Sequence, residues 1–142
     1  MYGQPEHVFV EIEWYDGPRA GVANVNGEPH RFVSNWDEEE GEYLGTFLVW
    51  PVGPEELALE QEQWRIFAAW NAEYEAGKAD TATHPGHPGM NKRWDEIASQ
   101  LAVCRDTTPA TARRAKALLV HLERGQRYAS SGPAYQLRWT LL

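Results

Sequence analysis

Apolar and polar residues alternate near both ends of the chain. The alternating apolar positions are Val8, Val10, Ile12 and Trp14 near the start, and Tyr135, Leu137, Trp139 and Leu141 at the end. A period of two predicts strands with one buried face. The last strand needs an edge to pair with. We expect the first strand to supply it, so that Glu11 and Glu13 face Arg138 across the ladder.

Two turn signals divide the first part of the chain into a meander. Residues 16–18 (Asp-Gly-Pro) predict a loop, and Asn26 with Gly27 is the strongest short-range signal for a two-residue hairpin. The strands expected after the first one span residues 19–25, 28–33 and 43–50. The last of these is apolar on both faces, which predicts a central strand.

Helical periodicity and capping signals predict three helices. The expected helices span residues 55–76 and 91–105, and from about 108 to a stop at Gly125. The third rests on Thr108 as the N-cap and Pro109 in the first turn, a position that tolerates proline. Together with the strands, these helices predict one α+β domain over residues 1–142. In it, an antiparallel sheet made of the four-stranded N-terminal meander and the C-terminal strand packs against about three helices.

The long first helix has apolar residues on two sides. The main stripe consists of Leu59, Ile66, Phe67, Trp70 and Tyr74. Leu57, Trp64 and Ala68 fall on a separate flank of the helical wheel. We therefore expect Trp64 to be available to a partner rather than packed on the sheet.

Charge and cysteine content narrow the class of protein. The net charge is −8; residues 1–76 hold 16 acidic and 3 basic side chains, whereas residues 77–142 hold 5 and 10. An acidic chain is a poor match for broad DNA or RNA binding. The single Cys104 excludes an internal disulfide, and no secretory signal or membrane-spanning run is present. A cytoplasmic protein without membrane attachment is expected.

Metal, cofactor and nucleophile motifs are weak. His84 and His87 lie in a tandem His-Pro-Gly loop, and His30, His121 or Asp95 would have to supply a third ligand. Their spacing favours a structural loop, and no metal or other cofactor is predicted. The one cysteine falls on the apolar stripe of its helix, which is typical of a core position.

The leading hypothesis is a non-catalytic module that binds a protein partner or a second copy of itself. Its candidate surface combines aromatic and charged residues of two loops with the spare flank of the long helix. These residues are Tyr15, Asp16, Arg19, Trp36, Asp37, Glu38 and Trp64. An aromatic anchor beside a run of acids suits a basic partner, which the module would neutralise. The other interpretation is that Arg19 pairs internally with the acids.

The alternative hypothesis is a small-molecule enzyme. Its cleft would lie between the sheet and the long helix and would use Arg19, His30 or Arg31. Histidine serves as a general base near neutral pH, and arginine clamps carboxylates or phosphates. A concave pocket with a buried His and Arg in contact would favour this enzyme over the binding module.

One block of the sequence resembles the opening of small bacterial proteins of unassigned function. It comprises Tyr15-Asp16-Gly17-Pro18-Arg19, Gly21, Ala23, Gly27, Pro29-His30 and Phe32. The likeness continues through residues 62–70 and the His84-Pro85 region. The resemblance implies a bacterial cytoplasmic protein and supplies no activity, cofactor or site.

Overall fold

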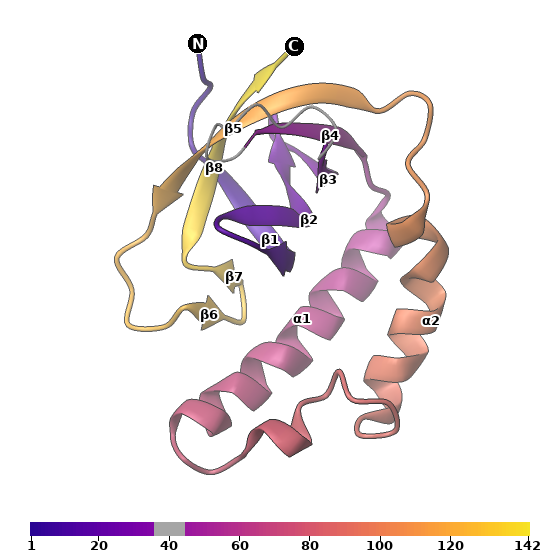
Figure 1. Ribbon diagram of the computed structural model, residues 1–142, viewed down its shortest axis with the longest axis vertical. Coiled ribbons are helices and arrows are strands. Elements are labelled where there is room, and N and C mark those ends of the chain that lie inside the picture. The colour runs from indigo at the N-terminus through magenta and orange to yellow at the C-terminus, as the bar shows by residue number, and fades with distance from the viewer. Residues whose placement is uncertain (36–44) are drawn as a thin grey trace.

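Six antiparallel strands close into a barrel, and two helices extend from it (Figure 1). The computed structural model describes residues 1–35 and 45–142. The barrel strands, in order around it, are β1 (Glu6–Trp14), β2 (Pro18–Val25), β3 (Glu28–Ser34), β4 (Thr46–Pro51), β5 (Arg113–His121) and β8 (Tyr135–Leu141). The other elements are α1 (Pro54–Glu75), the 3-10 turn η2 (Thr81–Thr83), α2 (Lys92–Asp106), and the small hairpin β6 (Tyr128–Ala129) and β7 (Gly132–Pro133).

The predicted meander is confirmed. Asn26 and Gly27 have φ angles of 54° and 79°, and they join β2 to β3 as a two-residue hairpin loop. The Glu6 carboxylate accepts hydrogen bonds from both of these amides, at 2.9 and 2.6 Å. At the other end of β2, Asp16 and Gly17 also have positive φ, so this turn too forms where the sequence predicted it.

The C-terminal strand pairs with the first strand, as predicted, but in a different register. Glu6 pairs with Leu137 and His7 with Gln136. Arg138 therefore does not face Glu11 or Glu13. Its guanidinium donates to the carbonyl oxygens of Gly3 and Tyr2 instead. The physical reason is that β8 begins only at Tyr135, so it reaches no farther than the first residues of β1.

The expectation of an open sheet with three helices is wrong. The predicted third helix is strand β5, which pairs with β4 on one edge and with β8 on the other and so closes the barrel. Its inward positions are small where its neighbours are large: Ala115 pairs with Phe47, and Ala117 with Trp139. Pairing on two edges and this size match outweigh the helix propensity of an Ala-, Leu- and Arg-rich segment.

Aromatic rings fill the barrel interior. Phe32, Phe47 and Trp139 contact one another with ring centroids 5.7–5.8 Å apart. Gly21 of β2 lies between strand β1 and the Phe32 ring. A Cβ atom there would stand 2.2 Å from the Val10 carbonyl oxygen and 2.8 Å from the Phe32 ring. The close approach of β1 and β2 therefore requires glycine at this position.

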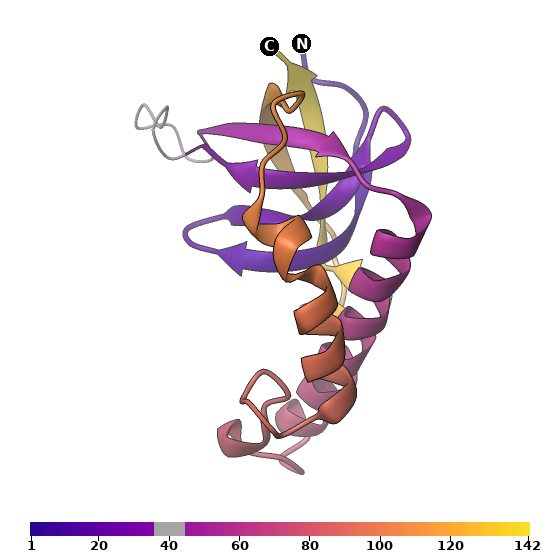
Figure 2. The ribbon, with the colours of Figure 1, turned by 90° about the vertical axis from the view of Figure 1, so that its right-hand side faces the viewer.

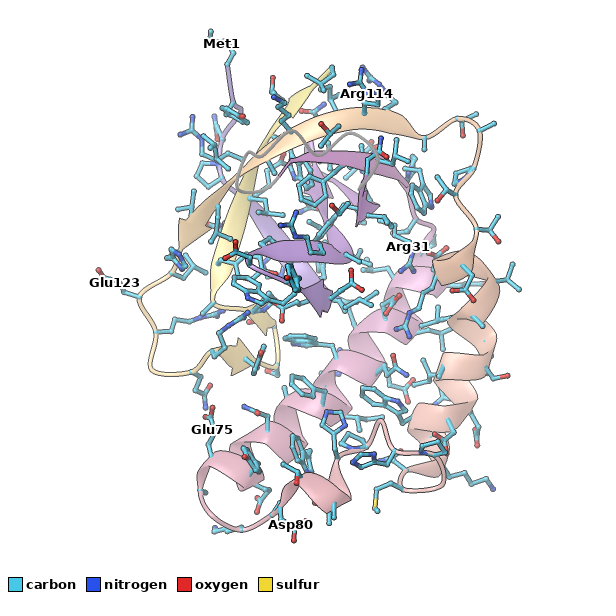
Figure 3. The ribbon with its side chains drawn as sticks, in the orientation of Figure 1. Met1, Arg31, Glu75, Asp80, Arg114 and Glu123 are labelled. Atoms are coloured by element: carbon cyan, nitrogen blue, oxygen red, sulfur yellow. The ribbon has the colours of Figure 1, made fainter. Side chains whose placement is uncertain are left out.

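A buried ion network fastens the helices to the barrel. Arg31 of β3, labelled in Figure 3, lies beside the first turns of α1. It donates from Nη2 to Glu56 and Glu60 of that helix, both at 2.7 Å. Arg105 of α2 donates to Glu60 Oε1 at 2.5 Å and to Gln63 at 2.6 Å. The Glu60 carboxylate thus joins β3, α1 and α2. Figure 2 shows the two helices side by side, projecting from one end of the barrel.

The face of α1 that packs on the barrel is the flank expected to be free. Its buried residues are Glu60, Gln63, Trp64, Ala68 and Asn71. These positions share one side of the helix, and three of them are polar. The predicted apolar stripe instead lies to one side, and Tyr74 in that stripe is 42% exposed.

Candidate functional site

A cleft of about 310 Å³ lies between β1 and the two helices. Strand β1 contributes Val10, Glu11 and Ile12 to it. The helices and the loop between them contribute the remaining lining residues, which are Gln63, Trp64, Phe67, His84, Trp94 and Arg105. This volume is at the lower end of the range of ligand pockets and suits a side chain or a small molecule.

The cleft adjoins the part of β1 that lies beyond its short pairing with β8. Strand β8 pairs with β1 only at Glu6 and His7, and within the described residues no strand pairs with the rest of that edge. The chain before β8 folds instead into the β6–β7 hairpin. The Trp64 indole N–H donates to the carbonyl of Ala129 in this hairpin, at 2.7 Å. The hairpin also lies close to β1, since a Cβ atom at Gly132 would stand 2.1 Å from the Val8 carbonyl oxygen. This part of β1 and α1 therefore border the same hollow.

Aromatic rings form a continuous wall of the cleft. The ring centroids of Trp64 and Phe67 are 5.4 Å apart, those of Phe67 and His84 5.7 Å, and those of His84 and Trp94 6.3 Å. Aromatic side chains bury large areas at low conformational cost, and they are enriched in binding sites. Trp64 itself is buried, so the partly exposed rings of Phe67, His84 and Trp94 are the aromatic surface that the cleft offers to a ligand.

His84 is held in its neutral form. The Gly86 amide donates to His84 Nδ1 at 2.8 Å, so this nitrogen must be unprotonated. Burial against the aromatic rings, and then the neighbouring His87, lower the pKa of His84 from its ordinary value of 6.5. The histidine that lines the cleft therefore adds no positive charge to it at neutral pH.

Replacing His84 with glutamine should weaken the pH dependence of stability. A lowered folded-state pKa means that protonation favours the unfolded chain, so stability is lost as pH falls below about 6.5. Urea unfolding at about pH 7.5 and about pH 5.5 should show a smaller loss for His84→Gln than for the wild type. His7, whose pKa burial also lowers, is present in both proteins and cancels. An equal loss in both would contradict this prediction.

The hypothesis of a metal at His84 and His87 finds no ligand set. The two rings are 5.9 Å apart, and His87 Nε2 lies 2.9 Å from the Thr81 carbonyl oxygen. No group of three or more His, Cys, Asp or Glu side chains suited to a metal ion occurs in residues 1–35 and 45–142.

A guanidinium lies beside β1 next to the cleft. Arg127 lies with its Cζ 4.6 Å from the ring centroids of Trp14 and Tyr128 and 5.4 Å from that of Tyr135. Glu11 Oε1 accepts hydrogen bonds from Arg127 at 2.7 Å and from Tyr135 at 2.9 Å. Burial, followed by the Glu11 carboxylate, raises the pKa of Tyr135. The Tyr135 hydroxyl therefore stays protonated and donates to Glu11.

Among the residues predicted to bind a partner, the described ones differ in exposure. Tyr15 is 69% exposed, and Asp16 lies beside it in an exposed turn. Arg19 is buried, and its Nε donates to the Tyr15 carbonyl oxygen at 2.7 Å. Trp64 is only 4% exposed, so the expectation that it faces away from the sheet is wrong. Trp36, Asp37 and Glu38 lie outside the described residues.

The residues of the enzyme hypothesis do not line the cleft. Arg31 is buried and paired with two carboxylates of α1. His30 Nδ1 lies 2.7 Å from the Glu28 carbonyl oxygen. His30 and Arg31 are consecutive in β3 and therefore point to opposite faces of the strand. A cleft does lie between the sheet and the long helix, but Glu11, His84 and Arg105 contribute its titratable groups.

Sequence reasoning missed the charged residues around the cleft, although a signal for some was present. Glu60 lies three residues after Leu57 and four before Trp64, on one face of the helix. In the same way, Arg105 follows Leu101 by four residues. A charged residue on the apolar face of each of two helices indicates a buried ion pair between the helices.

Comparisons with protein families, with curated proteins and with solved structures found no match to this chain. No helix among the described residues combines the length and the apolar composition that crossing a bilayer requires.

Proposed function

We propose that this protein is a non-catalytic binding module that accepts a side chain of a protein partner in the cleft beside β1. The observation that carries the proposal is the aromatic lining of a hollow of about 310 Å³ that borders the edge of β1 beyond its pairing with β8. The partner is either another protein or a second copy of this chain. A cytoplasmic location and a bacterial source remain predictions.

Exposed apolar side chains beside the cleft support contact with a protein. Ile12 lines the cleft and is partly exposed, and Trp14 and Tyr15 continue the exposed apolar surface along the end of β1. Aromatic residues are enriched in protein interfaces, whereas a binding site for one small molecule encloses its ligand. An anchor pocket with an apolar lip is typical of an interface that receives a side chain.

The internal hydrogen bonds of the charged groups that line the cleft favour binding over catalysis. Arg105 donates to Glu60 and Gln63, and Glu11 accepts from Arg127 and Tyr135. A general acid or base must reach the proton that it transfers, whereas Arg105 is held by internal partners and Glu11 Oε1 already accepts two hydrogen bonds. Their arrangement stabilises the walls of the cleft.

Site-specific crosslinking tests the proposal. A benzoylphenylalanine residue in place of Ile12, at the lip of the cleft, should yield a discrete crosslinked product in the cells that make the protein. The matched control carries the same residue in place of Val103, which is 73% exposed on α2 and does not line the cleft. No product from residue 12, or the same products from both positions, would overturn the proposed function.

A further inference from the structure

The Glu11 carboxylate helps to determine which chemical group binds in the cleft. This inference rests on the proposed function. Glu11 lines the cleft, and its side chain is only 8% exposed. The hydrogen bonds that its carboxylate accepts from Arg127 and Tyr135 both end on Oε1. A carboxylate has two oxygens and about four acceptor sites, so Glu11 has capacity for a further donor.

The protein already binds one internal guanidinium with the same kinds of group, a carboxylate and aromatic rings. Arg127 is held by Glu11 and by the rings of Trp14, Tyr128 and Tyr135. Stacking on aromatic faces together with pairing to a carboxylate is the usual way in which proteins recognise arginine. Glu11 is therefore shared between this internal guanidinium and the cleft.

The cleft offers the same combination of aromatic rings and a carboxylate. Phe67 and Trp94 supply partly exposed aromatic rings to it, and Glu11 supplies the carboxylate. We infer that the group taken up by the cleft is the guanidinium of an arginine side chain of the partner. The aliphatic stem of the arginine would pack on Val10 and Ile12, which lie at the same cleft.

The positive charges near the cleft are neutralised. Arg105 is paired with Glu60, which also holds Arg31, and Arg31 has a second carboxylate partner in Glu56. These two arginines and two glutamates balance, and Arg127 balances Glu11. A further guanidinium would therefore share the Glu11 carboxylate with Arg127, as Arg31 and Arg105 share Glu60. His84 is neutral because Nδ1 accepts a hydrogen bond from the Gly86 amide.

The remaining charge of the molecule favours a cation. The chain carries a net charge of −8, and Glu13 and Asp16, which follow Glu11 in the sequence, are exposed. A net negative charge attracts a basic partner and speeds its association. The charge of the chain therefore favours a basic side chain over an acidic one.

Three amino-acid probes test this inference by NMR titration of the indole N–H signals. They are the N-acetyl, N′-methylamide derivatives of arginine, of citrulline, its uncharged analogue of the same shape, and of norleucine. The arginine probe should shift the Trp94 signal with a Kd about tenfold lower than that of the citrulline probe. Glu11→Gln should abolish this preference, whereas Glu13→Gln, on the same strand but outside the cleft, should keep it.

Each outcome has one meaning. Equal binding of arginine and citrulline, or tighter binding of norleucine, overturns the arginine assignment and leaves uptake of a side chain standing. No shift with any probe also overturns the assignment, and the crosslink at residue 12 then decides the proposed function separately. If Glu11→Gln does not fold, because it disturbs Arg127, the comparison of arginine with citrulline on the wild-type protein remains decisive.

Discussion

Replacing Glu60 with alanine should lower the free energy of unfolding by about 3–5 kcal/mol, a large part of the stability of a domain of this size. The Glu60 side chain is fully buried and accepts hydrogen bonds from both Arg31 and Arg105. Without it, two guanidinium groups lose a carboxylate at the junction of the barrel and the helices. Urea unfolding, monitored by tryptophan fluorescence, measures the loss.

The matched control for Glu60 is Glu62 on the same helix. Its carboxylate pairs with Arg93 at the surface, where water and salt screen the interaction. Glu62→Ala should therefore shift the unfolding midpoint only slightly. Equal losses for the two variants would mean that the buried network does not fasten the helices to the barrel.

Replacing Trp64 with alanine should cost about 3–5 kcal/mol, the range for a buried aromatic side chain. The ring packs against Val10 and Val22 of the barrel, and its N–H donates to the Ala129 carbonyl oxygen. Trp64→Phe should lose less, because it keeps most of the buried surface, although it removes the hydrogen bond. The same unfolding measurement, read by circular dichroism because a fluorophore is removed, gives both values.

Tyr74→Ala is the control for Trp64. Tyr74 is an aromatic residue of the same helix, but it is 42% exposed and stacks on Trp70 rather than on the barrel. Its replacement should cost clearly less than that of Trp64. A loss for Trp64→Ala no larger than for Tyr74→Ala would contradict the packing of α1 on β1, and with it the wall of the cleft.

Glu60 and Trp64 lie on the same buried face of α1. The composition of this face explains why the hydrophobic pattern predicted the wrong buried side of the helix. The buried face includes Glu60, Gln63 and Asn71, so it is not the most apolar side of the helix. A more apolar stripe through Phe67 and Trp70 lies to the side, at the cleft and the η2 loop. Hydrophobic periodicity identifies a face only where burial is apolar, and here ion pairs and hydrogen bonds hold much of the buried face.

The cleft is the part of the protein that the sequence could indicate least. Its walls come from β1 and from the consecutive segment α1, His84 loop and α2, and three strands separate β1 from this segment along the chain. Glu11 and Arg127 are separated by 116 positions, and no local spacing predicts that they meet. The aromatic content was visible, but its assembly around one hollow depends on how the helices are fastened.

The sequence by itself determined the elements that depend on neighbouring residues. Asn26 and Gly27 specify their turn because they tolerate positive φ, and alternation specifies the first and last strands. Asn91 caps α2 by accepting a hydrogen bond from the Trp94 amide. Only the tertiary structure decided that residues 113–121 form a strand, that the sheet closes, and that Trp64 is buried. These outcomes depend on size matching and charge pairing between residues distant in the chain, which no local pattern encodes.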